Sequence, residues 1–113
     1  MKRLLTVAAL ILVLSAPAFA LSDAEYKEFM KNAKFAEADD ELTNVYKEAK
    51  KIMSEDDFEE LKKEQREWVK STRDKEAKKL IKERKISRVK AYTIVTLSRA
   101  GDLKKRVIYY VED

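Results

Sequence analysis

Apolar side chains recur every three or four residues along most of the chain, which is the spacing of one helix face. The clearest stripe runs through Ala38, Leu42, Val45, Tyr46, Ala49, Ile52 and Met53. Ser54 and the three acids after it are typical of a helix start, so a new helix begins about two residues later. A connection this short predicts an antiparallel helix hairpin.

The remaining segments also favour helices. The capping box Ser22 to Glu25 predicts a first helix over 23–34, followed by a joint at 35–38. The helix after Ser54 should run from 55 to about 84, because neither Gly nor Pro interrupts it. We therefore predict an all-α fold, a small bundle of three to four helices built on the antiparallel hairpin.

The last third of the sequence is ambiguous. Helical spacing favours a helix over 87–100, with Gly101 and Asp102 capping or kinking it. Residues 107–111 are rich in β-branched and aromatic side chains and form the best strand candidate, although no partner strand is evident.

The N-terminus has the pattern of a cleavable signal peptide. Two basic residues precede an apolar run over 4–14, and Ala18-Phe19-Ala20 matches a signal-peptidase site. The run is shorter than the roughly 20 residues that span a bilayer. We expect residues 1–20 to be removed and residues 21–113 to form one helical domain in the periplasm or the medium, without a transmembrane segment.

Composition excludes several function classes. The 113 residues include no Cys and no His, and a single Gly. A thiolate metal site, a Cys nucleophile, a His general base and a Gly-rich phosphate loop are thus all missing. The acidic runs 39–41 and 55–57 lack the spacing of a calcium loop. We therefore expect a protein that is not an enzyme and holds neither a metal nor a cofactor.

Charge is divided along the chain. Residues 21–61 carry a net charge of −7, whereas residues 62–106 carry +11. Lys78, Lys82 and Lys85 fall on one face of the expected third helix, a candidate surface for an anionic partner. That face is open to three interpretations: a solvated helix surface, contact with anionic envelope lipid or polymer, or contact with nucleic acid, which export makes unlikely.

One segment of the third helix combines unusual residues. Leu61, Gln65 and Trp68 share a face, and Trp68 is the only Trp of the chain. We expect Trp68 to anchor the core, and a buried Gln65 must then find hydrogen bonds. Arg73 is a candidate to pair with an acid of the second helix.

These residues, together with a trailing Thr-x-x-Arg-x-x-x-Leu, give a pattern that resembles the lysozyme inhibitor LprI N-terminal domain family over about residues 22–106. The positions that carry the resemblance are Leu42, Tyr46, Leu61, Gln65, Trp68, Arg73, Asp74, Tyr92, Thr96, Arg99 and Leu103. The chain departs from the family pattern by lacking Cys and by spacing Trp68 five residues from Arg73, where four is common.

The resemblance implies a small exported helical protein with a protein partner. It also implies inhibition of lysozyme, an activity attached to a few members. A lysozyme is basic and has two carboxylates in its cleft. An inhibitor could present acids 39–41 and 55–60 to the basic surface, or insert a Lys or Arg between the carboxylates. An anionic envelope surface and a purely structural role remain as alternatives.

Overall fold

The computed structural model describes residues 20–112, and every regular element in that range is helical. The elements are α2 (Asp23–Phe29), α3 (Ala33–Ile52), α4 (Glu55–Glu67), the π-helical turn η1 (Trp68–Thr72), α5 (Arg73–Arg84) and α6 (Arg88–Glu112). This confirms the predicted all-α bundle. The predicted signal peptide lies, except for Ala20, outside the described residues.

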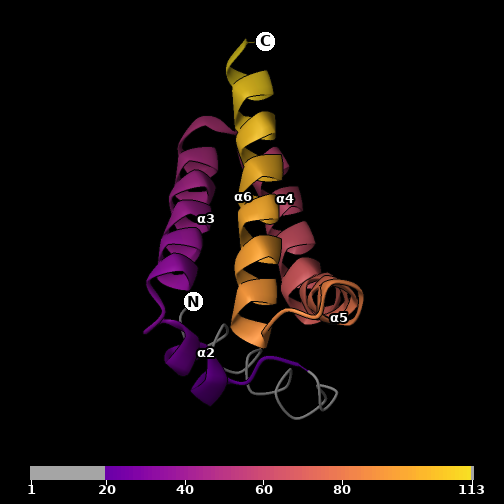
Figure 1. Cartoon of the computed structure of the whole chain (residues 1–113). Helices are drawn as coiled ribbons and strands as arrows, with labels where there is room; N and C mark the ends of the chain where they lie inside the picture. The colour runs from indigo at the N-terminus through magenta and orange to yellow at the C-terminus, as the bar shows by residue number, and fades with distance from the viewer. Residues whose placement is uncertain (1–19, 113) are drawn as a thin grey trace.

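The long helix α6 is the centre of the arrangement. Figure 1 shows α3 and α4 running alongside α6, with α5 seen almost end-on and α2 crossing below α3. The most extensive helix contact is that of α3 with α6, and α5 also packs on α6. Buried residues from all of these helices form one core, which includes Phe35, Leu42, Leu61, Tyr92 and Leu103. Within residues 20–112, no helix is both long and apolar enough to cross a membrane.

The predicted joint at 35–38 is wrong. Helix α2 ends at Phe29 and α3 begins at Ala33, because the Asn32 side chain accepts hydrogen bonds from the backbone N–H groups of Lys34 and Phe35. The chain turns at residues 30–32, which lets Phe29 and Phe35 meet in the core with ring centroids 5.4 Å apart. The hairpin turn is as expected, with Ser54 capping α4 through the Asp57 N–H.

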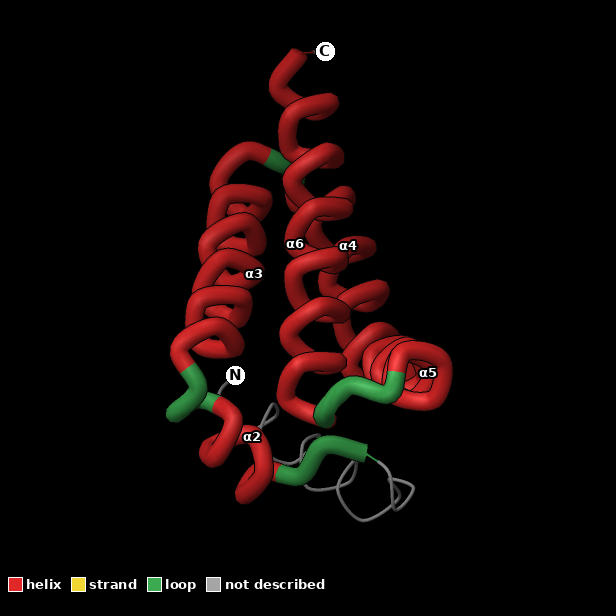
Figure 2. Tube along the Cα trace, viewed as in Figure 1, coloured by secondary structure: helices red, strands yellow, loops and turns green. Residues whose placement is uncertain are grey.

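The expected uninterrupted helix over 55–84 contains a π-helical turn. The backbone N–H of Arg73 donates to the carbonyl of Trp68, five residues earlier. In an α-helix of 3.6 residues per turn, side chains five apart would point about 140° apart. The wider turn brings Trp68 and Arg73 back onto a common face and redirects the chain. Figure 2 shows α5 leaving the direction of α4 after this turn.

The predicted end of the last helix at residue 100 is also wrong, and residues 107–111, the best strand candidate, are helical. Helix α6 continues from Arg88 to Glu112, through Gly101 and Asp102. Its bundle-facing positions continue as well: Leu103 is fully buried, and Val107 packs against the core. The Tyr110 hydroxyl donates to Asp57 Oδ2 at 2.9 Å and accepts from the Ser54 N–H at 2.8 Å. These contacts hold the final turns against the α3–α4 hairpin.

Candidate functional site

The residues of the sequence motif converge where η1 and the start of α5 meet α6. We call this group the Arg–aromatic cluster, and its members are Gln65, Trp68, Arg73, Asp74, Tyr92 and Arg99. Asp74 and Tyr92 are buried, and Trp68 is 8% exposed. The π-helical turn positions the cluster, because it presents Trp68 and Arg73 to the same helix.

Asp74 is the buried acid of the cluster, with 7% exposure. Its Oδ1 accepts from the Tyr92 hydroxyl and, at 3.4 Å, from the backbone N–H of Leu21. Arg73 Nε lies 3.7 Å from the same oxygen. Burial first, and then the hydrogen bond to Asp74, raise the pKa of Tyr92 well above its ordinary value. The phenol therefore stays protonated and serves as a donor.

Arginine side chains alternate with the two aromatic rings. The Arg73 guanidinium lies 6.0 Å from the Trp68 ring centroid and 5.7 Å from that of Tyr92. Arg99 lies 5.8 Å from Trp68, and Arg88 lies 5.6 Å from Tyr92. Cations over aromatic faces at these distances are stabilised by the ring electrons. The cluster thus joins α5 and α6 by cation–π contacts as well as by apolar packing.

Gln65 supplies the hydrogen bond that Arg99 needs. Gln65 Oε1 accepts from Arg99 Nε at 2.9 Å. Arg99 Nη2 and Arg73 Nε are buried without a hydrogen-bond partner. Burial lowers the pKa of Arg99, and nearby Arg106 lowers it further. A buried cation with one free donor is costly, so the Gln65 contact matters for stability.

The other motif positions belong to the core rather than to a surface. Leu42, Leu61, Thr96 and Leu103 are buried. Tyr46 is partly buried and packs on Phe58, with ring centroids 5.2 Å apart.

The predicted partner of Arg73 is wrong. Its ion pair is with the adjacent Asp74, not with an acid of α3. On α3, Asp39 accepts from the Tyr26 hydroxyl at 2.7 Å. That contact ties α2 to α3, and α2 is also tied to α6 by a two-bond pair of Arg88 with Glu25, both at 2.7 Å. Sequence reasoning missed both ties, because residues 13 and 63 positions apart leave no local pattern.

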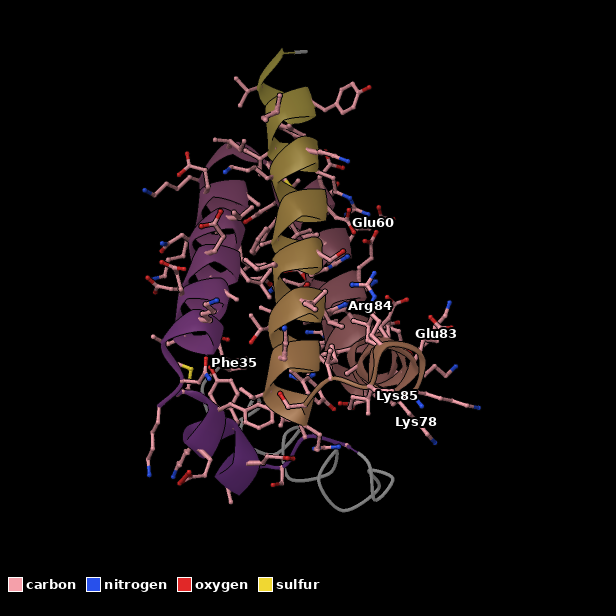
Figure 3. All side chains as sticks on the ribbon, in the orientation of Figure 1. Phe35, Glu60, Lys78, Glu83, Arg84 and Lys85 are labelled. Atoms are coloured by element: carbon pink, nitrogen blue, oxygen red, sulfur yellow. The ribbon has the colours of Figure 1, made fainter. Side chains whose placement is uncertain are left out.

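Two exposed charged surfaces lie outside this core. The first, the basic arm, is formed by Lys78 and Lys82 on α5 and by Lys85 just after it. Lys85 has φ of 54°, so it caps α5 in the left-handed region and does not continue the helical face of the other two. Figure 3 shows Lys78 and Lys85 at the lower side of α5, away from α3.

The second surface, the acidic edge, consists of Glu55, Asp56 and Glu60 on α4. All three are exposed, and none takes part in an ion pair among residues 20–112. Two other acids of this half are engaged in ion pairs, Glu41 with Lys104 at 3.6 Å and Glu59 with Lys62 at 2.8 Å. The first two turns of α4 therefore present an exposed acidic surface, whereas Lys63 and Arg66 are exposed farther along the helix.

The contacts of the Arg–aromatic cluster are internal to the fold. The polar groups of the Arg–aromatic cluster point at one another, and their contacts join helices. In the described part of the chain, no three acidic side chains converge as metal ligands would. The acidic edge and the basic arm are exposed surfaces outside this cluster.

Comparison with known families gives one match. The model of a family described as Lysozyme inhibitor LprI matches residues 20–105, which takes in α2 to α5 and most of α6. No curated protein and no solved structure matches the chain.

Proposed function

Because this chain belongs to the lysozyme inhibitor LprI family, we propose that it is an exported protein that inhibits lysozyme by direct protein contact. The single observation that carries the proposal is the extent of the match. Residues 20–105 contain the whole Arg–aromatic cluster and both charged surfaces, so the match covers the residues on which the proposal rests.

The acidic edge is the surface that best suits a basic partner. Opposite charge accelerates encounter and orients the two proteins, and this effect weakens as salt screens it. Glu55, Asp56 and Glu60 are exposed without ion-pair partners, so no internal salt bridge has to break before binding. The competing mode places a cation of the basic arm between the two cleft carboxylates of the enzyme.

The test is a lysozyme assay with the purified chain 21–113 over a range of salt. Stoichiometric inhibition that fades as salt rises is the expected result. Two matched triple variants separate the modes, since each removes three charges: Glu55→Gln with Asp56→Asn and Glu60→Gln, against Lys78→Gln with Lys82→Gln and Lys85→Gln. We expect the first to lose inhibition and the second to keep it. No inhibition by the unaltered chain at large excess rejects the proposal.

A second candidate function rests on the basic arm. On α5, the only acids beside the buried Asp74 are Glu76 and Glu83, whereas Lys75, Lys78, Lys79, Lys82 and Arg84 are all exposed. Such an arm would attract an anionic envelope lipid or polymer. Binding to vesicles of phosphatidylglycerol, compared with phosphatidylcholine, tests this role. The triple Lys variant should abolish binding, and unchanged binding would exclude the basic arm as the contact.

A further inference from the structure

The backbone nitrogen of Leu21 lies at a buried carboxylate far away in the sequence. It donates to Asp74 Oδ1 at 3.4 Å, across 53 residues, and the Leu21 side chain packs against the core. This distance is long for an amide hydrogen bond, for which 2.7–3.2 Å is usual. The neutral amide therefore stabilises the Asp74 carboxylate only weakly. Arg73 Nε lies 3.7 Å from the same oxygen and forms no hydrogen bond to it.

Leu21 is also the first residue after the signal-peptidase site expected from the sequence. The Ala18-Phe19-Ala20 pattern and the contact with Asp74 are independent observations, yet they point to the same nitrogen atom. Hydrolysis of the Ala20–Leu21 bond adds the hydroxyl of water to the Ala20 carbonyl and a hydrogen to the Leu21 nitrogen. At neutral pH that amine takes up a further proton, because its ordinary pKa is about 7.7–8.0.

We propose that signal-peptide removal places the new Leu21 ammonium against the Asp74 carboxylate, and that this ion pair completes the fold. The inference rests on the proposed export with cleavage after Ala20, and not on lysozyme inhibition. An ammonium has three donors and a full charge, so it makes a shorter and stronger bond to a carboxylate than an amide does. The precursor lacks this bond and is less stable, which suits a chain that must cross a membrane unfolded.

The charges around the nitrogen set the size of the effect. On α5 the nitrogen contacts Asp74, which also lies beside the opposing cation Arg73. On α6 Asp74 is bonded to Tyr92, and the cation over the Tyr92 ring, Arg88, is paired with Glu25 of α2. The attraction of Asp74 is thus partly offset by Arg73. We expect the α-amino pKa to rise by about one unit, which corresponds to a tenfold gain in the folding equilibrium constant, or about 1.4 kcal/mol.

The experiment compares three chains that retain Asp74: residues 21–113, the same chain acetylated at Leu21, and residues 20–113, which move the ammonium by one residue. Urea unfolding at pH 7 should give the unacetylated 21–113 chain a folding equilibrium constant about tenfold larger than that of either other chain. Folding raises the pKa of the Leu21 α-amino group. The added stability of the 21–113 chain is therefore complete below about pH 7.7, and it disappears as pH rises through the pKa of the folded state, about 9. Equal stability of all three chains overturns the proposal.

Two further measurements test the role of Asp74 and the position of the cleavage separately. Asp74→Asn should remove the difference between 21–113 and its acetylated form, and a difference that persists contradicts a role for Asp74. If Asp74→Asn does not fold, the stability comparison of 21–113 with the acetylated chain and with 20–113 still tests the proposal. Mass spectrometry of the exported protein should show Leu21 as its first residue, and another start overturns the inference while leaving the lysozyme assay unaffected.

Discussion

Gln65 Oε1 accepts a hydrogen bond from Arg99 Nε at 2.9 Å, which joins α4 to α6 across 34 residues of sequence. Arg99 is already short of one partner, since its Nη2 is buried and unbonded. Replacing Gln65 by Leu would leave the guanidinium with a second unsatisfied donor. We expect Gln65→Leu to lower the free energy of unfolding by about 1–3 kcal/mol, measured by urea denaturation.

Glu67→Ala is the matched control for Gln65→Leu, because Glu67 is an exposed residue of the same helix. Exposed substitutions of this kind usually change stability by less than about 0.5 kcal/mol. Equal effects of the two variants would mean that the Gln65–Arg99 bond contributes nothing specific.

The side chain of Trp68 fills the space between Arg73 and Arg99, with its ring 6.0 Å and 5.8 Å from the two guanidinium centres. Trp68→Ala creates a cavity and removes both cation–π contacts. We expect it to cost about 3–5 kcal/mol, measured by thermal unfolding followed by circular dichroism. Trp68→Phe retains an aromatic face and should cost clearly less. A melting temperature that barely moves in Trp68→Ala would contradict a core role.

The helix hairpin could be predicted from the sequence because its signals are local. The apolar stripe of α3 and the Ser54 cap lie within one or two turns of the structure they determine. The joint before α3 was placed too late because Asn32, its cap, is followed by Ala33 and Lys34 rather than by the acids that usually mark a helix start. The Asn32 side chain alone caps α3, without acidic residues in the first turn of the helix.

The contacts of the candidate site join residues far apart in the sequence, so local sequence patterns predict them less well than they predict the hairpin. The extra residue between Trp68 and Arg73 was visible in the sequence, but only the structure shows that a π-helical turn absorbs it. The β-branched residues of 107–111 suggested a strand because propensity was the sole local signal. Bonds of Tyr110 to the hairpin, 53 and 56 residues away, override that propensity.

Three tyrosines make stability sensitive to alkaline pH. Burial raises the pKa of Tyr46. Partial burial, together with the bond to Asp39, raises the pKa of Tyr26 to about 12, and deeper burial also raises that of Tyr92. Unfolded tyrosine ionises near pH 10, so this contribution is complete below that pH and is lost as pH rises toward 12 and above. Urea unfolding from pH 8 to 11.5 should show stability falling above pH 10.

Tyr92→Phe should make this alkaline decline less steep, although it lowers stability at pH 8 by removing the donor to Asp74. Tyr109→Phe is the control, because Tyr109 is 73% exposed on α6. A decline that is equally steep in Tyr92→Phe would show that Tyr92 ionisation is not its cause.

Lys85 occupies the left-handed region, with φ of 54°, where its Cβ is unfavourable and Gly is preferred. We expect Lys85→Gly to raise the free energy of unfolding by about 1 kcal/mol, as measured by urea denaturation. Lys82→Gly removes the same charge inside α5 and should lower it by about 1 kcal/mol. If both variants lower the free energy of unfolding equally, Lys85 does not adopt the left-handed conformation.

Gly101 lies inside α6, where Gly is less favourable than Ala because it loses more backbone freedom on folding. It is exposed, its φ is not positive, and a Cβ built there would meet no atom within 4 Å. Gly101→Ala should therefore raise the free energy of unfolding by about 1 kcal/mol, the difference in helix propensity between the two residues. Urea denaturation measures this gain, and Ser98→Ala, at another exposed position of α6, should give a smaller one. Destabilisation by Gly101→Ala would show instead that the helix ends or kinks at residue 101, which would release the Tyr110 contacts beyond it.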